Sequence, residues 1–185
     1  KISIIDQERK KEHIFLEEER KRVPELFHTE PLIDSPEILK SIGIEGVFKN
    51  YPLGHIKYMP QDFIVEEIAG GKTISTIDIE STIKNLEGSG KTFYGQLVKI
   101  DITTFDVRQE IADILGVPIE KIATAGLKDE IAITSQNISL REIPNVEKLK
   151  ELERDNFFVK NIERGKGVYK RGDLWGNRFI IAVRT

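Results

Sequence analysis

The chain has 185 residues, a hydrophobic fraction of 39% and a formal net charge of −3 at pH 7. This length is enough for one domain with a sizeable core. The chain has no cysteine, which excludes a disulfide framework and a thiolate metal site. No apolar run approaches the length that crosses a bilayer, and no signal peptide is visible. We therefore expect a cytoplasmic protein without a membrane partner.

The first 45 residues predict helices and carry no catalytic signal. Residues 6–22 are rich in Glu, Lys and Arg and predict a helix that Pro24 ends. Ser35-Pro36-Glu37 combine a cap residue, a proline at the first helical position and an acid in the first turn, which predicts a short helix to residue 42. We assign residues 1–45 to an N-terminal helical segment with a packing or linker role.

The next segments predict strands. Residues 56–68 read as extended chain broken by Pro60, with Phe63 and Val65 on one face of a strand. The Gly-Ser-Gly-Lys at 88–91 lacks the first glycine of a phosphate-binding loop and leads into the alternating residues 94–102 instead of a helix. We interpret 88–91 as a hairpin loop.

Helices and strands then alternate to the end of the chain. Thr103 or Thr104 caps a helix that Gly116 closes, and a second helix is predicted to start at Pro144-Asn145. Strands are predicted at 157–164 and in the final alternating segment from residue 178. The pattern favours an α+β fold with a mixed, mainly antiparallel sheet and covering helices.

The segment Ala125–Gln136 is the strongest candidate for chemistry. It follows an apolar stretch and precedes an alternating one, and Gly126 can let the chain turn where a side chain would clash. Lys128 and Asp129 should therefore sit at a strand edge or in a short turn, where functional groups are often mounted. The alternative is an ordinary hairpin with a solvated Lys-Asp pair.

Positive charge gathers at the C-terminal end of the chain. Residues 157–185 hold seven Lys or Arg against two acids, a local charge of +5. Such a patch can bind phosphates whatever the net charge of the whole chain, although a solvated basic surface is the alternative. The cations that we assign to an RNA backbone are Lys166, Lys170 and Arg171. The three histidines show no ligand spacing, so we expect no metal and no cofactor.

Three stretches form a pattern in order along the chain. The central one is Ala125-Gly-Leu-Lys-Asp129 followed by Ala132-Ile-Thr134 and Gln136. The earlier one is Lys57-Tyr-Met-Pro-Gln-Asp-Phe63 with Val65 and Glu67, and the later one is Gly176-Asn-Arg-Phe179. Together these stretches resemble motifs of the TruD family of tRNA pseudouridine synthases.

The resemblance implies isomerisation of a specific uridine in tRNA to pseudouridine, without a cofactor. By match, Asp129 is the nucleophile and attacks either C1′ or the uracil ring. A deprotonated Asp in a closed site needs a cation, for which Lys57 or Lys128 is the candidate, with Lys57 favoured. Phe179 matches an aromatic that stacks in the nucleotide pocket, and Asn177 a residue that supports it. The substrate-binding set is Lys57, Phe63, Lys128, Asn177 and Phe179.

The resemblance also implies that residues 46–185 are the first half of a catalytic domain. Family members continue into a second half, which we expect to be required to complete the site. The chain departs from the family at Gln61, where Glu is usual, and at Glu130, where a basic residue is usual. Two alternatives stay open: a catalytically inactive RNA-binding protein or fragment of the same fold, and a protein-interaction domain that shares the motif by chance.

Overall fold

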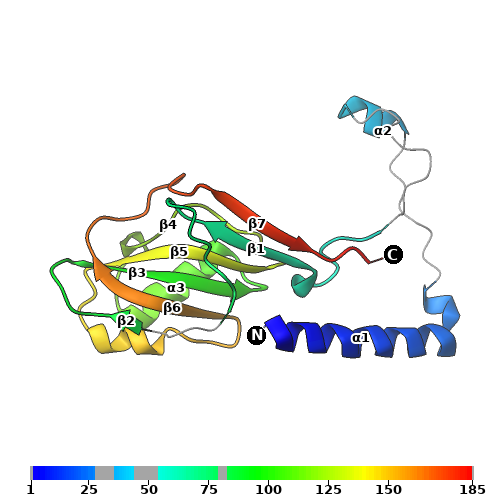
Figure 1. Ribbon diagram of the computed structural model, residues 1–185, viewed down its shortest axis with the longest axis horizontal. Coiled ribbons are helices and arrows are strands. Elements are labelled where there is room, and N and C mark those ends of the chain that lie inside the picture. Colours follow the sequence, from blue (N-terminus) through cyan, green and yellow to red (C-terminus); the bar gives the residue numbers. More distant parts are fainter. Residues whose placement is uncertain (1, 28–35, 44–53, 79–82, 185) are drawn as a thin grey trace. The chain divides into compact units, whose positions relative to one another are not determined.

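The computed structural model describes residues 2–27, 36–43, 54–78 and 83–184, and Figure 1 shows the arrangement of their elements. The chain divides into two compact units. One consists of Ile56–Ala182 with the first two residues of the chain, and the other of Ser3–His55 with Val183–Thr185. The site predicted from the sequence lies in the first of these units.

The described residues of the N-terminal unit include helices close to the two positions predicted for them. Helix α1 (Ile2–Arg22) ends just before Pro24, which begins a short 3-10 helix, Pro24–Phe27. Helix α2 (Pro36–Ser41) has its proline at the first position, while the expected cap residue Ser35 lies outside the described residues. Among the described helices, none is both long enough and apolar enough to cross a membrane.

The larger unit is built on a seven-stranded mixed sheet, which confirms the predicted α+β class. Six strands follow the order β2-β6-β3-β5-β1-β7, and β4 pairs with β5 beside this path. The β1/β5 and β2/β6 pairs are parallel and the other pairs are antiparallel. The strands are β1 (Phe63–Ile68), β2 (Ile83–Asn85), β3 (Thr92–Ile100), β4 (Ile122–Thr124), β5 (Ile133–Arg141), β6 (Phe157–Gly165) and β7 (Gly176–Ile181).

Three local predictions were wrong. The loop at 88–91 is not a hairpin, because β2 pairs with β6 and not with β3. Residues 56–62 are not extended: bends and a 3-10 helix, Pro60–Asp62, precede β1, because a proline pre-sets the first turn of a helix. The helix expected after Pro144 is only a 3-10 helix, Val146–Glu151.

Helix α3 (Thr104–Leu115) covers one face of the sheet and forms the main core with it (Figure 1). Of the two candidate caps, Thr103 is the one used: its hydroxyl accepts from the Asp106 main-chain N–H at 3.0 Å. Gly116 ends the helix in the left-handed region, with φ 69°. The buried side of the helix consists of Val107, Ile111, Ala112 and Leu115, which pack against Leu97, Ile138, Leu140 and Val159 of the sheet.

Truncation in this core tests the packing of α3 on the sheet. Ile111 is fully buried, so Ile111→Ala should lower the free energy of unfolding by about 2–5 kcal/mol through lost burial and a residual cavity. Asp113→Ala, on the exposed side of the same helix, should change it by less than about 0.5 kcal/mol. Urea unfolding of both variants is the measurement, and equal effects would show that α3 does not dock as described.

Candidate active site

The segment that carries Lys128 and Asp129 is a short loop between two paired strands. It leaves β4 after Thr124 and enters β5 at Ile133, and the two strands run antiparallel. The sequence predicted a strand edge or a short turn for Lys128 and Asp129, and the structure has a loop of bends that joins the two strands. The turn does not depend on Gly126, because a Cβ there would meet Leu174 at 3.7 Å, an ordinary van der Waals contact.

A buried lysine of β3 holds the main chain of this loop. Lys99 is 1% exposed, and its ammonium donates to the carbonyl oxygens of Asp129 at 2.6 Å and Ile102 at 2.7 Å. Burial lowers the pKa of Lys99 from 10.5 to about 8, while the negative charges of Asp129 and Glu130 act in the opposite direction. The backbone at the candidate nucleophile is thus fixed from beneath by a charge-assisted hydrogen bond.

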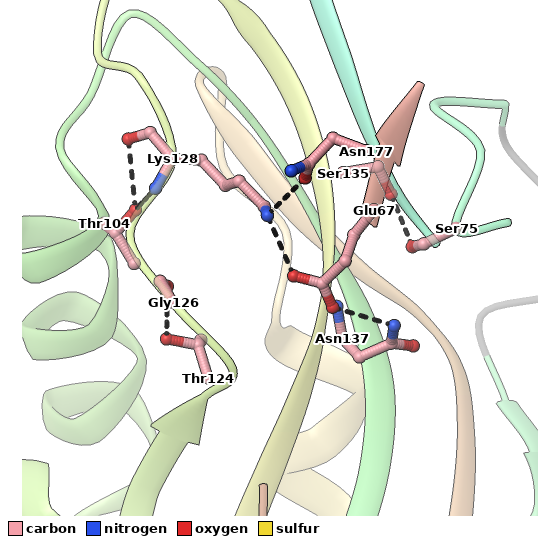
Figure 2. A network of polar contacts seen from close by, with 9 residues as sticks. All are labelled: Glu67, Ser75, Thr104, Thr124, Gly126, Lys128, Ser135, Asn137 and Asn177. Carbon is pink, nitrogen blue, oxygen red and sulfur yellow. Dashed lines mark hydrogen bonds and ion pairs between the residues drawn. The ribbon is translucent and has the colours of Figure 1, made fainter. Parts of the chain in front are cut away.

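Figure 2 shows the partners that hold the neighbouring lysine, Lys128. The Lys128 ammonium lies 3.0 Å from Glu67 Oε2 and donates to Asn177 Oδ1 at 2.7 Å. The other carboxylate oxygen of Glu67 accepts from the main-chain N–H and the side-chain amide of Asn137, both at 3.0 Å. Both ion-pair side chains are almost fully buried, so loss of one partner would leave an uncompensated charge.

The start of α3 is tied to the same loop. The Lys128 main-chain N–H donates to the Thr104 hydroxyl at 3.0 Å (Figure 2). Thr104 is the first residue of the helix and is buried. Three elements, β1, β7 and α3, therefore converge on Lys128, whose ammonium is paired with Glu67 and Asn177 inside the protein.

The side chain of Asp129 has a different cation. Asp129 Oδ1 accepts from the Lys57 ammonium at 2.5 Å, and both side chains are partly exposed, at 42% and 31%. Lys57 itself has a φ of 56°, a conformation that is uncommon for a residue with a side chain and that is often found at functional sites. Of the two candidate cations, Lys57 is the one that pairs with the Asp129 carboxylate.

Two aromatic rings adjoin this ion pair. The Lys57 ammonium lies 4.1 Å from the centroid of the Phe63 ring, and the Phe63 and Phe179 rings are 5.8 Å apart with a tilt of 57°. Phe179 pairs with Val65 across β1 and β7, so it stands on the same face as Phe63. Its ring is 52% exposed, whereas Phe63 is 8% exposed. The face therefore offers a carboxylate, a cation and an open aromatic surface side by side.

The opposite face of the same strands holds a second buried acid. Glu66 Oε2 accepts from Arg178 Nε at 2.7 Å, and Glu66 Oε1 accepts from the Ile77 main-chain N–H at 2.8 Å. This arrangement joins β1 and β7 behind the candidate site. Arg178 thus serves to position β7, which carries Asn177 and Phe179.

The basic residues assigned to an RNA backbone lie outside this group. Lys166, Lys170 and Arg171 are exposed, in the segment between β6 and β7. That segment reaches the site through Gly172, whose N–H donates to the Ala125 carbonyl at 2.8 Å. No metal-binding cluster of His, Cys, Asp or Glu occurs among the residues that the structure describes.

Sequence reasoning missed three residues that build the site: Glu67, Lys99 and Thr104. A signal existed for Lys99, because it shares its strand face with Leu97 and Phe93, which are buried. Glu67 stands likewise on the face of Phe63 and Val65. An acid or a lysine at a core-facing position of a strand indicates a buried partner.

The protonation of Lys99 gives a testable consequence for stability. Since the folded-state pKa is about 8 and the unfolded value about 10.4, the unfolded chain binds more protons between these values. The free energy of unfolding of the parent should therefore rise relative to that of Lys99→Met as the pH increases from about 8 to 10. Below pH 7 the difference between the two proteins should not change with pH. Paired urea titrations at pH 6, 7, 8 and 9.5 measure this difference, and a constant difference across the series would contradict the burial of a charged Lys99.

Comparisons with known proteins identify the family to which the chain is similar. The family model described as tRNA pseudouridine synthase D (TruD) matches residues 49–185. A "Probable tRNA pseudouridine synthase D 1" of Methanocaldococcus jannaschii is 33% identical over 135 residues, which are 72% of this chain and 34% of the relative. The "tRNA pseudouridine synthase D" of Aquifex aeolicus is also 33% identical over 135 residues, covering 70% and 31%.

A solved structure shares the fold. The crystal structure of a putative tRNA pseudouridine synthase D from Methanosarcina mazei superposes with a TM-score of 0.66 at 30% identity, over 83% of this chain and 32% of that one. The chain spans about a third of the length of the relatives that it matches. The resemblance expected from the sequence is confirmed: this chain belongs to the TruD family of tRNA pseudouridine synthases.

Proposed function

We propose that the protein isomerises a specific uridine of tRNA to pseudouridine, with Asp129 as the nucleophile. The observation that carries the proposal is the Lys57–Asp129 ion pair, whose lysine lies over Phe63 with the exposed Phe179 on the same face. Family membership supports the reaction class, since the relatives bear the name of this activity. A tRNA substrate is in keeping with the cytoplasmic location expected from the sequence.

The reaction requires three steps that the site must support. The bond from N1 of the base to C1′ must break, the base must turn, and C5 must bond to C1′ while its proton leaves and N1 gains one. A carboxylate that attacks either C1′ or the uracil ring can hold the intermediate covalently. The base must also leave its stack and find a new surface in the protein.

The described residues can be matched to these needs. Lys57 donates a hydrogen bond to the Asp129 carboxylate and places a positive charge beside it, which orients the proposed nucleophile. Phe179 presents a ring on which a flipped uracil can stack, supported by Phe63 beneath it. Lys128 and Asn177 act on the loop and on β7 from inside the protein, so we assign them to positioning of the pocket rather than to direct contact with the base.

The proposal includes a second half of the catalytic domain, which is required to complete the site. Because the chain spans about a third of its relatives, the activity concerns the protein at full length. The exposed basic residues Lys166, Lys170 and Arg171 would hold phosphates of the tRNA, an interaction that orients the substrate without reading its sequence. An inactive RNA-binding protein of the same fold remains the alternative, and turnover distinguishes the two.

Replacement of the nucleophile tests the proposal. Asp129→Asn keeps the shape of the side chain and removes its negative charge, so tritium release from tRNA labelled with 5-³H-uridine should fall by at least ~10³-fold, about 4 kcal/mol of transition-state stabilisation. Affinity for tRNA should stay within roughly threefold, since phosphate contacts and stacking are retained.

Glu130→Gln is the matched control, because it neutralises the adjacent exposed carboxylate. This variant should keep most of the turnover. Near-normal tritium release by Asp129→Asn would remove Asp129 from the mechanism. Equal loss of release and of tRNA binding would instead make it a structural residue.

A further inference from the structure

A short segment, which we call the strap, is hydrogen-bonded to the loop that carries the candidate nucleophile. It runs from Gly172 to Asn177, and both of its ends bond to that loop. The Gly172 N–H donates to the Ala125 carbonyl at 2.8 Å, and Asn177 Oδ1 accepts from the Lys128 ammonium at 2.7 Å. The middle of the strap is therefore held beside the loop, at the end of β1 opposite Phe63.

The middle of the strap exposes a tryptophan. Leu174 faces the loop, since its Cδ2 lies 3.7 Å from the point that a Cβ on Gly126 would occupy. Trp175 is 64% exposed, although its main-chain N–H is fixed to the Ile68 carbonyl at 2.8 Å. The backbone of Trp175 is thus anchored to β1 while most of its side chain stays open to solvent.

One cation lies against the indole, and two more are close to it in the sequence. The Lys72 ammonium lies 5.3 Å from the centroid of the Trp175 ring. Lys170 and Arg171 are exposed just before the strap, and Asp173 accepts a bond from the Lys170 main-chain N–H at 2.6 Å. An aromatic face among Lys and Arg side chains is the combination with which proteins bind single-stranded nucleic acid, because bases stack while the cations track the phosphates.

We propose that Trp175 is a stacking platform for an unpaired base of the RNA substrate, next to the uridine that enters the Asp129 pocket. The proposal rests on the proposed function and adds a second nucleotide-binding position to it. Trp175 lies four residues from Phe179, at most about 14 Å of extended chain. The base on Trp175 therefore belongs to a nucleotide other than the target, and every base has a face that can stack there.

Fluorescence provides a direct test, because Trp175 is the only tryptophan among the 185 residues. The experiment uses the full-length protein and its Trp175→Phe variant, and the difference between the two spectra isolates Trp175. Before RNA is added, iodide should quench this signal, as expected for an open indole. Addition of tRNA should quench it further and protect it from iodide.

Binding titrations supply the second readout. Trp175→Leu keeps an apolar side chain but loses the ring, and it should weaken tRNA binding about tenfold, which corresponds to about 1.4 kcal/mol. Trp175→Phe should stay within about threefold. The slope of log K against log salt should not change, because stacking neutralises no phosphate. Phe15→Leu, which removes an exposed ring from α1, is the matched control and should bind like the parent.

Three results would overturn the proposal. Trp175 fluorescence that does not respond to bound tRNA would exclude stacking, while pseudouridine formation by the same protein would leave the proposed function intact. An indole already shielded from iodide in the free protein would show that another part of the protein covers it. A parent that does not bind tRNA at all would contradict both the stacking platform and the proposed function.

Discussion

Two buried lysines that need partners determine the geometry of the candidate site. An ammonium group cannot stay in the interior without compensating charge or hydrogen bonds, so Lys99 and Lys128 must each find acceptors. Lys99 finds them in the Asp129 and Ile102 carbonyl groups, and Lys128 in Glu67 and Asn177. Each lysine thereby fixes a connection between elements that are far apart in the sequence.

This arrangement leaves the Asp129 carboxylate free to point outward. The main chain at Asp129 is held from the sheet, while its side chain is partly exposed and paired with Lys57. A rigid backbone with an accessible carboxylate suits a nucleophile, because a reacting group must be held close to its productive geometry. Phe63 and Phe179 stand on the same face, and Arg178 secures their strand pair from behind through Glu66.

The sequence predicted the parts with local signals and missed those that depend on distant contacts. Composition and Pro24 were enough for α1, and periodicity was enough for α3 with its Gly116 end and for β6, while the cap of α3 stayed open between Thr103 and Thr104. The pairing of β2 with β6 was missed because adjacent segments suggested a hairpin. The motifs indicated Asp129, Lys57 and Phe179, whose roles stay predictions, whereas the hydrogen bond from Lys99 to the Asp129 carbonyl joins segments that are far apart in the sequence.

The central claim is that Lys57 and Asp129 work as one unit, and a double-mutant cycle on turnover tests it most directly. The rate of pseudouridine formation would be measured for the parent, Lys57→Met, Asp129→Asn and the double variant. If the lysine acts through the carboxylate, its loss should matter little once Asp129 is neutralised, so the double variant should be about as slow as Asp129→Asn alone. Losses that multiply in the double variant would contradict the account, because the two residues would then act independently.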